Sequence, residues 1–483
     1  MATYQKVGFV LGPALFALIL FLDPPEGLGV AGWRTVAVVA WMATWWATEA
    51  IPVPATSLLP MILFPLLEVS SLGAATAPYS NPVIYLLLGG FIVAVALERW
   101  NLHRRIALNI LKRVGDHPAA IIFGFMVATA LLSMWVSNTA STMMMVPIAL
   151  SVAAVVTAEH NSRPGDDHRF LVALLLGIAY SASIGGLGTL IGTPPNAMMA
   201  GYILDRYGVE ITFAHWMLFA VPVVVVMVPL AWLVLTRLTF PVQIAPNPEA
   251  RKLVAAELRK LGPIAQVERR VMVVFGAVAL AWMTRPLLQM IPGLHELSDT
   301  VIAIAGAVAM FLVPAGKAVG KGEFLLNWAS AERIPWGVIL LFGSGMSIAA
   351  QVSSTGLAGW IGGYLEALTT LHLVFLIAAI VTLVIFLTEL TSNTGTTATI
   401  LPILGALADV SAHSPLMLAA PAALAATCAF MLPVATGPNA VVYARGGLRV
   451  PEMAGAGFRL NLVGIVVITA MSYLLLPLVF SMA

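Results

Sequence analysis

The triplet Ser-Asn-Thr occurs twice in apolar surroundings, at 137–139 and again at 392–394. Side-chain hydroxyls, amide oxygens and the carbonyls of unwound backbone are hard oxygen ligands that suit a sodium ion without supplying a fixed charge. The same hydroxyl and amide groups can donate to carboxylate oxygens, and a helix that restarts inside a membrane presents free N–H groups to an anion. The two triplets could therefore hold the two ends of a dianion.

Further oxygen donors surround each triplet and make two candidate sodium sites. The first set contains Ser133, Ser137, Asn138 and Gly192. The second set contains Thr388, Thr391, Asn393 and Ala435. A lone triplet would more often serve helix packing, because Ser and Thr in membrane helices commonly bond to their own helix or to a neighbour. Two copies in matching surroundings favour a binding site instead.

The spacing around the triplets indicates an internal duplication. In each half a glycine after a leucine-rich run precedes the triplet, with 48 residues from Gly89 to Ser137 and 49 from Gly343 to Ser392. In each half a proline–asparagine turn follows the triplet, and because proline removes a backbone donor, such turns open the helix. We expect broken helices at both turns, with Pro195 and Pro438 lining the substrate site.

Composition predicts an all-α polytopic membrane protein. The chain of 483 residues is 60% hydrophobic and 10% charged, with a mean hydropathy of +0.96. Apolar runs of bilayer-spanning length recur and suggest about eleven spans. The net charge of +2 gives no reason to expect a nucleic-acid partner, and the single Cys428 excludes an internal disulfide.

Charge predicts opposite orientations for the two copies. The first copy continues after its glycines into the basic segment 99–113, and segment 237–270 carries a further basic excess, so both should be cytoplasmic. In the second copy no Lys or Arg occurs between Arg333 and Arg445, so that copy should start in the cytoplasm and run outward. Inverted repeats of this kind are typical of secondary transporters, whose sites lie at the helix breaks.

These signals divide the chain into five parts. We expect N-terminal scaffold helices, a first inverted repeat, scaffold helices that include the basic loop, a second inverted repeat and a C-terminal helix, at 1–82, 83–215, 216–334, 335–450 and 451–483 respectively.

Two acidic residues in apolar segments, Glu49 and Glu389, are candidates for a direct role in transport. Either could carry a proton, yet each lies near a polar break where a carboxylate can instead cap a helix. The sequence contains no phosphate-binding loop, no His-rich metal cluster and no carboxylate pair suited to catalysis, which disfavours an ATP-driven pump and an intramembrane enzyme. Paired interruptions within one chain also disfavour a channel.

Several motifs together resemble the divalent anion:sodium symporters, which include the INDY-type dicarboxylate transporters. They are the two triplets, Thr-Glu-Ala-Ile-Pro at 48–52, Glu-Arg-Trp-Asn-Leu-His-Arg-Arg at 98–105, and the glycine-rich segment 183–196 that ends in Thr-Pro-Pro-Asn. The resemblance implies a multi-pass homodimer in the bacterial cytoplasmic membrane, with a scaffold domain and a transport domain that moves like an elevator.

The resemblance also implies roles for individual residues. Two re-entrant hairpins would precede the triplets, near 118–133 and 355–371. The two oxygen sets would hold sodium as the coupling ion. Substrate would contact Ser137, Asn138, Thr139, Ser392, Asn393, Thr394 and Thr436.

The leading interpretation is sodium-coupled uptake of a C4-dicarboxylate such as succinate, malate or fumarate. Sodium-independent exchange of dicarboxylate or citrate and symport of sulfate are the alternatives, because hydroxyls and amides can bind any of these anions. Two departures from the family pattern affect the second copy: its turn reads Thr-Gly-Pro-Asn, and Thr391 stands where a smaller residue is usual.

Overall fold

The computed structural model describes residues 3–157, 165–241, 244–316, 320, 322–411 and 413–480. The regular secondary structure of these residues is helical, and the one extended pairing among them is an isolated bridge between Pro314 and Phe324. The all-α prediction is confirmed.

The described residues of the first half of the chain form twelve α-helices and a 3₁₀-helix, η1 (Ala77–Ser80). The α-helices are α1 (Thr3–Phe21), α2 (Val30–Thr48), α3 (Val53–Thr56), α4 (Leu59–Leu66), α5 (Leu72–Thr76), α6 (Pro82–Arg99), α7 (Leu102–Leu111), α8 (Pro118–Ser133), α9 (Asn138–Val156), α10 (Asp166–Gly186), α11 (Pro194–Tyr207) and α12 (Phe213–Leu233).

The second half begins with a π-helical turn, η2 (Val234–Thr239), and also contains the 3₁₀-helix η3 (Glu366–Thr370). Its α-helices are α13 (Pro248–Lys260), α14 (Gln266–Leu288), α15 (Asp299–Leu312), α16 (Trp328–Ala331), α17 (Trp336–Ser354), α18 (Leu357–Leu365), α19 (Leu373–Thr388), α20 (Asn393–Val410), α21 (Pro415–Thr427), α22 (Gly437–Gly446) and α23 (Val450–Phe480).

Eight of the described helical segments are long and apolar enough to cross a membrane, and five shorter apolar segments accompany them. The chain is therefore an integral membrane protein with several spans. The shorter helices include α8, α19 and α21, which end at the polar interruptions that the sequence analysis singled out. The estimate of about eleven spans stays a prediction, since length and composition alone do not separate a full span from a re-entrant helix.

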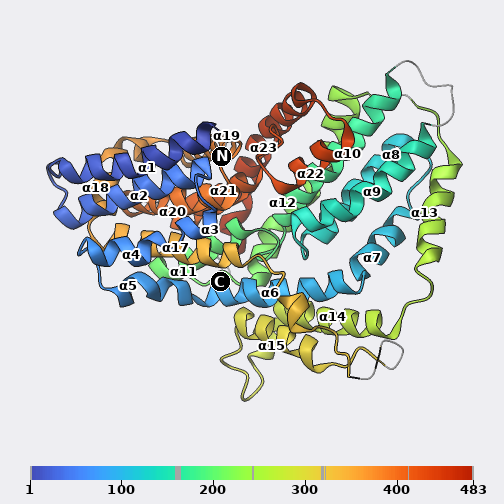
Figure 1. Cartoon of the computed structure of the whole chain (residues 1–483), viewed down its shortest axis with the longest axis horizontal. Coiled ribbons are helices and arrows are strands. Elements are labelled where there is room, and N and C mark those ends of the chain that lie inside the picture. The colour runs from blue at the N-terminus through green and yellow to red at the C-terminus, as the bar shows by residue number, and fades with distance from the viewer. Residues whose placement is uncertain are drawn as a thin grey trace.

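Figure 1 shows α1 and α2 side by side near one end of the molecule and α8 and α9 side by side near the other, with α12 and α21 between them. Nearly every residue of α10 and α21 is buried. Because both helices are apolar on all sides, they form the interior around which the others pack.

Each of these buried helices is followed by an unwound link and a second, shorter helix. The first link, 187–193, joins α10 to α11, and the second link, 428–436, joins α21 to α22. The short helices cross over: α11 packs against α20 and α21, whereas α22 packs against α9 and α10. This exchange brings the two breaks together in the interior of the molecule.

The structure changes the expected position of the hairpins. Each triplet lies at the tip between two antiparallel helices, α8 and α9 for the first and α19 and α20 for the second, so the hairpins are centred on the triplets rather than preceding them. The predicted segment 118–133 is the first arm of one hairpin. The predicted segment 355–371 was wrong: it forms α18 and η3, and the helix that leads into the second triplet is α19.

A buried ion pair fastens the basic end of the molecule. Arg105 of α7 makes two bonds to the Glu268 carboxylate, at 2.9 and 3.0 Å, and donates to the carbonyls of Leu261 and Gly262. Arg99 at the end of α6 and Arg104 lie beside it in the chain, so this end is cytoplasmic by the positive-inside rule.

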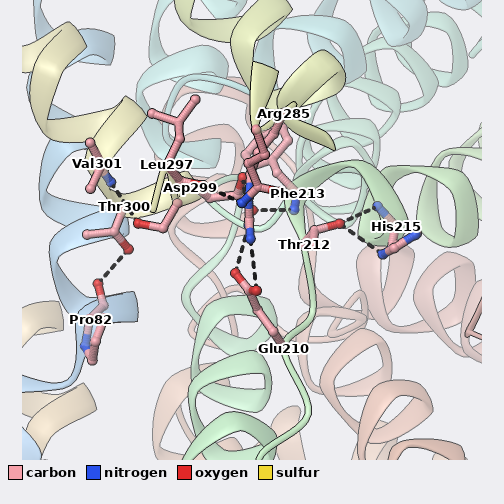
Figure 2. Close-up of polar contacts among 12 residues, drawn as sticks. Pro82, Glu210, Thr212, Phe213, His215, Arg285, Leu297, Asp299, Thr300 and Val301 are labelled. Carbon is pink, nitrogen blue, oxygen red and sulfur yellow. Dashed lines mark hydrogen bonds and ion pairs between the residues drawn. The ribbon is translucent and has the colours of Figure 1, made fainter. Parts of the chain in front are cut away.

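A second ion-pair cluster lies at the opposite end, where α14 ends and α15 begins. Figure 2 shows Arg285 between two carboxylates: its guanidinium lies 2.7 and 2.8 Å from the Glu210 oxygens and 3.3 Å from Asp299. The other Asp299 oxygen accepts from the Phe213 backbone N–H at 2.6 Å. The cluster, defined here as Glu210, Phe213, Arg285 and Asp299, ties the link between α11 and α12 to the ends of α14 and α15.

Candidate functional site

The two triplets begin two helices in the same way. Ser137 is the N-cap of α9 and its hydroxyl accepts from Ala140 N–H at 3.2 Å. Ser392 is the N-cap of α20 and accepts from Gly395 N–H at 3.0 Å. An N-cap serine starts a helix by satisfying one of its free N–H groups, while the others remain available to an anion. The sequence Ser-Asn-Thr therefore ends one hairpin arm and starts the next.

The asparagine of each triplet is held by the last residue of the preceding helix. Ser133 donates to Asn138 Oδ1 at 2.5 Å, and Thr388 donates to Asn393 Oδ1 at 2.9 Å. Both amide oxygens therefore point back across the tip of their own hairpin. The two residues of each pair are five positions apart in both halves, and the chemistry of the pairs differs only by the methyl group of threonine.

The first link is organised by Asn196 of α11. Its Nδ2 donates to the carbonyls of Gly186, Leu187 and Thr189, at 3.2, 3.1 and 2.8 Å. Buried carbonyls that have left a helix need such donors, because no water reaches them. Thr189 then joins the link to the hairpin tip, since it donates to Met134 O at 2.5 Å and accepts from Gly192 N–H at 3.0 Å.

Oxygen atoms crowd around Gly186 in the first break. A Cβ atom at this residue would lie 2.6 Å from Asn138 Oδ1 and 3.1 Å from the carbonyl oxygen of Gly192. Only glycine fits there, and its absence of a side chain leaves room for these oxygens to converge. Three members of the first predicted sodium set, Ser133, Asn138 and Gly192, thus meet at one point, with Gly186 as a further contributor.

The second link repeats part of this arrangement. Asn439 donates to the carbonyls of Ala429 and Leu432, at 3.1 and 3.0 Å. Thr388 donates to Ala426 O at 2.7 Å in addition to its bond to Asn393, so the hairpin tip is again tied to the break. Thr436 is the N-cap of α22 and accepts from Asn439 N–H at 3.2 Å.

Contacts in the structure account for both departures from the family pattern. At Gly437, which takes the place of Pro194 of the first turn, a Cβ atom would lie 2.1 Å from the Thr139 hydroxyl, so the first triplet reaches the second break and excludes a side chain. The Thr391 hydroxyl is engaged by Leu387 O at 3.0 Å and by the hydroxyl of Thr396. The extra hydroxyl therefore has partners in its own hairpin.

The two hairpin tips and the two breaks line one cavity of about 1010 Å³. Eleven of the predicted site residues line it: Ser137, Asn138, Thr139, Gly192, Thr391, Ser392, Asn393, Thr394, Ala435, Thr436 and Pro438. Ser133 and Thr388 lie behind this surface, each bonded to its asparagine, and Pro194 lines the cavity where Pro195 was expected.

The cavity extends to the basic, cytoplasmic end of the molecule. Its wall includes Val95 and Glu98 near the end of α6, Arg333 before α17, and Glu49 after α2. Among the described residues that line it, none belongs to the Arg285 cluster at the other end. The cavity therefore faces the cytoplasmic end of the molecule, away from the Arg285 cluster.

Sequence reasoning gave no individual role to five residues that the geometry places at or beside the breaks. Gly186 and Thr189 lie within the glycine-rich segment 183–196, which was treated as a family signature without individual roles. Asn196 and Asn439 were noted only as parts of turns. Their position at the end of each proline turn could have indicated their role, because an asparagine there can reach back to the preceding carbonyls. Asn461, which lies on α23 beside Glu389, gave no local signal at all.

Two broken helices, two hairpins and one shared cavity define the class of protein, a polytopic secondary transporter. A family model described as the sodium:sulfate symporter transmembrane region matches residues 5–482, and the chain belongs to this family. The match spans nearly the whole sequence and agrees with the resemblance read from the motifs.

Individual proteins also match over nearly their full lengths. The chain is 43% identical over 476 residues to the sodium-dependent dicarboxylate transporter SdcS of Staphylococcus saprophyticus, covering 98% of this chain and 92% of the relative. It is 41% identical to the protein of the same name from Staphylococcus aureus strain MRSA252, covering 99% and 93%. A solved structure, the YdaH transporter of Alcanivorax borkumensis, has a TM-score of 0.56 at 16% identity, covering 97% and 96%, and so shares the fold.

Proposed function

We propose that this protein is a symporter of the bacterial cytoplasmic membrane that couples uptake of a C4-dicarboxylate to sodium. The observation that carries the proposal is the convergence of two Ser-Asn-Thr tips, one from each half, on a single cavity with two sets of oxygen ligands. The relatives named sodium-dependent dicarboxylate transporters, at 41–43% identity, support the same substrate and the same ion.

In this proposal the two tips bind opposite ends of the substrate. Each carboxylate would receive hydrogen bonds from the free N–H groups at the start of α9 or α20 and from the amide and hydroxyl groups of one triplet. Sodium ions would occupy the two oxygen sets beside Asn138 and Asn393. Because each asparagine belongs both to an ion set and to a triplet, sodium would organise the substrate site, which is the physical basis of coupling.

We propose alternating access by an elevator movement of the hairpins and broken helices against the remaining helices. The cavity reaches the cytoplasmic end, while the Arg285 cluster joins the α11–α12 link to α14 and α15 at the other end. Transport would require this cluster to open when the cavity turns outward. The family resemblance further supports a homodimer, which we expect chemical cross-linking in membranes to detect as a single species of twice the 51.0 kDa chain mass.

The test is uptake of radiolabelled succinate by the purified protein in liposomes. We expect uptake with an inward sodium gradient, none when potassium replaces sodium, and no requirement for succinate inside the liposomes. Uptake that requires internal succinate and ignores sodium would identify an exchanger and contradict the proposal.

Sulfate is the second candidate, because the family description names it. Labelled sulfate in the same liposomes separates the two substrates. Sodium-driven sulfate uptake that unlabelled succinate does not inhibit would replace the dicarboxylate assignment while leaving sodium coupling intact.

A further inference from the structure

Glu389 is a buried carboxylate at the end of α19, directly after Thr388 and three residues before Ser392. Its Oε1 accepts from Phe430 N–H at 2.7 Å and from Met431 N–H at 2.9 Å. Its Oε2 accepts from Met431 N–H at 3.0 Å and from Leu432 N–H at 3.2 Å. Three consecutive backbone N–H groups of the second link therefore converge on one side chain.

The carboxylate has one more partner, and it is also a donor. Asn461 of α23 is fully buried and donates from Nδ2 to Glu389 Oε1 at 2.8 Å. Every hydrogen-bond partner of the two oxygens is thus an N–H group. A carboxylate surrounded by donors is stabilised in its ionised, acceptor-only form, so these bonds favour a negative charge on Glu389 at the second break.

The hydrogen bonds to Glu389 fix the position of the second link, 428–436. Its residues 430–432 have left the helix, and without an acceptor their N–H groups would be unpaired in the protein interior. Glu389 satisfies these donors while Asn439 satisfies the carbonyls of Ala429 and Leu432. The link is therefore held from both sides, and its last part contains Ala435, whose carbonyl belongs to the second oxygen set.

The first break has no counterpart to this charge. The residue that corresponds to Glu389 in the first copy is Met134, the residue after Ser133. Only its backbone carbonyl takes part, as the acceptor for Thr189. The two ion sets therefore differ in electrostatics although their neutral ligands correspond.

We propose that Glu389 is a positioning residue for sodium at the second oxygen set: it fixes the 428–436 link and supplies the uncompensated negative charge that makes this set the tighter of the two. Glu389 does not touch the ion or the substrate in this proposal. It acts through the backbone that it holds and through Coulomb attraction along the wall of the cavity, which Glu389 also lines. The proposal rests on the proposed function, since it assigns a role within the sodium sites.

The test measures sodium affinity separately from maximal rate. Succinate uptake into liposomes is followed as a function of external sodium for the wild type and for Glu389→Gln, which keeps the size of the side chain and removes its charge. We expect the half-saturating sodium concentration to rise about tenfold or more, with a maximal rate at saturating sodium of the same order as the wild type. An unchanged half-saturating concentration in Glu389→Gln overturns the proposal.

Glu296→Gln is the matched control, because Glu296 lies in the exposed loop between α14 and α15, away from the cavity. It should leave the sodium curve unchanged, and a shift equal to that of Glu389→Gln would mean that loss of any carboxylate suffices. Where Glu389→Gln does not yield folded protein, Glu389→Asp keeps the charge and shortens the side chain. We expect it to shift the half-saturating concentration several-fold, and no shift would again overturn the proposal.

A binding measurement separates this inference from the proposed function. The melting temperature of purified protein is recorded against sodium chloride, with potassium chloride at equal ionic strength as reference. Sodium should raise the wild-type melting temperature by mass action, and Glu389→Gln should need about ten times more sodium for the same rise. If sodium does not raise the melting temperature of the wild type, the assignment of sodium as coupling ion is contradicted. If sodium raises the melting temperature of both proteins equally, only the role of Glu389 is contradicted.

Discussion

The two breaks share one design and stabilise it with different chemistry. In both, an asparagine one turn into the short helix donates back to the carbonyls of the unwound link, and the end of a hairpin arm is tied to that link. The first link is otherwise held by neutral groups and close glycine contacts. The second link is held by the Glu389 carboxylate, which has no equivalent in the first.

The two halves thus pair the carbonyls of their links in the same way and the amide groups in different ways. The carbonyls paired by Asn196 and Asn439 occupy corresponding positions, Gly186 with Ala429 and Thr189 with Leu432. In the first link the Thr189 hydroxyl accepts from one N–H group, that of Gly192, whereas in the second link Glu389 accepts from three. A broken helix in a membrane can thus be satisfied by either a hydroxyl or a carboxylate.

The largest expected effects come from the two residues that both halves share. Asn138→Ala and Asn393→Ala each remove an ion ligand and leave the partner hydroxyl, Ser133 or Thr388, without its acceptor. We expect each variant to lose sodium-driven succinate uptake by about two orders of magnitude or more. Near-normal uptake by either one would mean that the corresponding half does not hold an ion through its asparagine.

Substitutions at Gly186 and at Ala429, which occupy corresponding positions in the two halves, should have different effects on sodium binding. Gly186→Ala forces a Cβ atom to within 2.6 Å of Asn138 Oδ1, and the strain of about 1–3 kcal/mol should weaken sodium binding by roughly 10- to 100-fold. Ala429→Gly is the reverse change at the corresponding position and should leave the half-saturating sodium concentration within about threefold of the wild type. Equal losses in the two variants would remove the distinction between a glycine-packed and a carboxylate-held break.

The hydroxyl of Thr189 provides the next test. Thr189→Val keeps the shape of the side chain but deprives Met134 O of its donor and Gly192 N–H of its acceptor. We expect a loss of stability of about 1–3 kcal/mol, measured as a lower melting temperature, together with weaker sodium binding. Thr382→Val is the control, because the Thr382 hydroxyl only bonds to Ala378 O of its own helix. If Thr382→Val lowers the melting temperature and weakens sodium binding as much as Thr189→Val does, the Thr189 hydroxyl has no specific role in the first break.

The smallest effect concerns the far side of the molecule. Glu210→Gln weakens one pair of the Arg285 cluster, and because the Glu210 side chain is 47% exposed, the change should be at most about 1 kcal/mol. We expect the equilibrium constant between the inward-open and outward-open states to change by up to about fivefold, with the inward-open state less populated. The rate at which a thiol reagent added on the cytoplasmic side labels Val95→Cys, in a protein with Cys428 replaced by Ser, measures this change. An unchanged labelling rate would show that this contact does not bias the two orientations.

The sequence predicted the parts of the site that depend on short-range pattern. Paired triplets and paired turns predicted the two breaks and eleven of the residues that line the cavity, whereas the hairpins were expected before the triplets and lie around them. The duplication itself stays a prediction. Ser133 and Thr388 were expected as ligands, and the structure adds that each already holds the asparagine of its own set. These residues lie close together along the chain, so their relation could be predicted without knowledge of the fold.

The remaining features depend on contacts between segments far apart in the sequence. Thr139 excludes a side chain at Gly437 across the two halves, and Asn461 reaches Glu389 from the last helix. Segment 355–371 was expected from the resemblance to form the second hairpin, and hydropathy alone does not distinguish the short helix found there from a re-entrant one. For Glu389 the sequence left a proton carrier and a cap as alternatives, and its five bonds from N–H donors favour the cap.

A negative charge on Glu389 also has a consequence for membrane voltage. If α19 to α22 travel together as proposed, the empty protein carries one uncompensated negative charge through part of the bilayer. An elementary charge that crosses a full potential of 100 mV changes in free energy by about 2.3 kcal/mol. With the cytoplasm negative, this term favours the outward return of the empty protein. Voltage would then drive the cycle by acting on the protein itself as well as on the ions it carries.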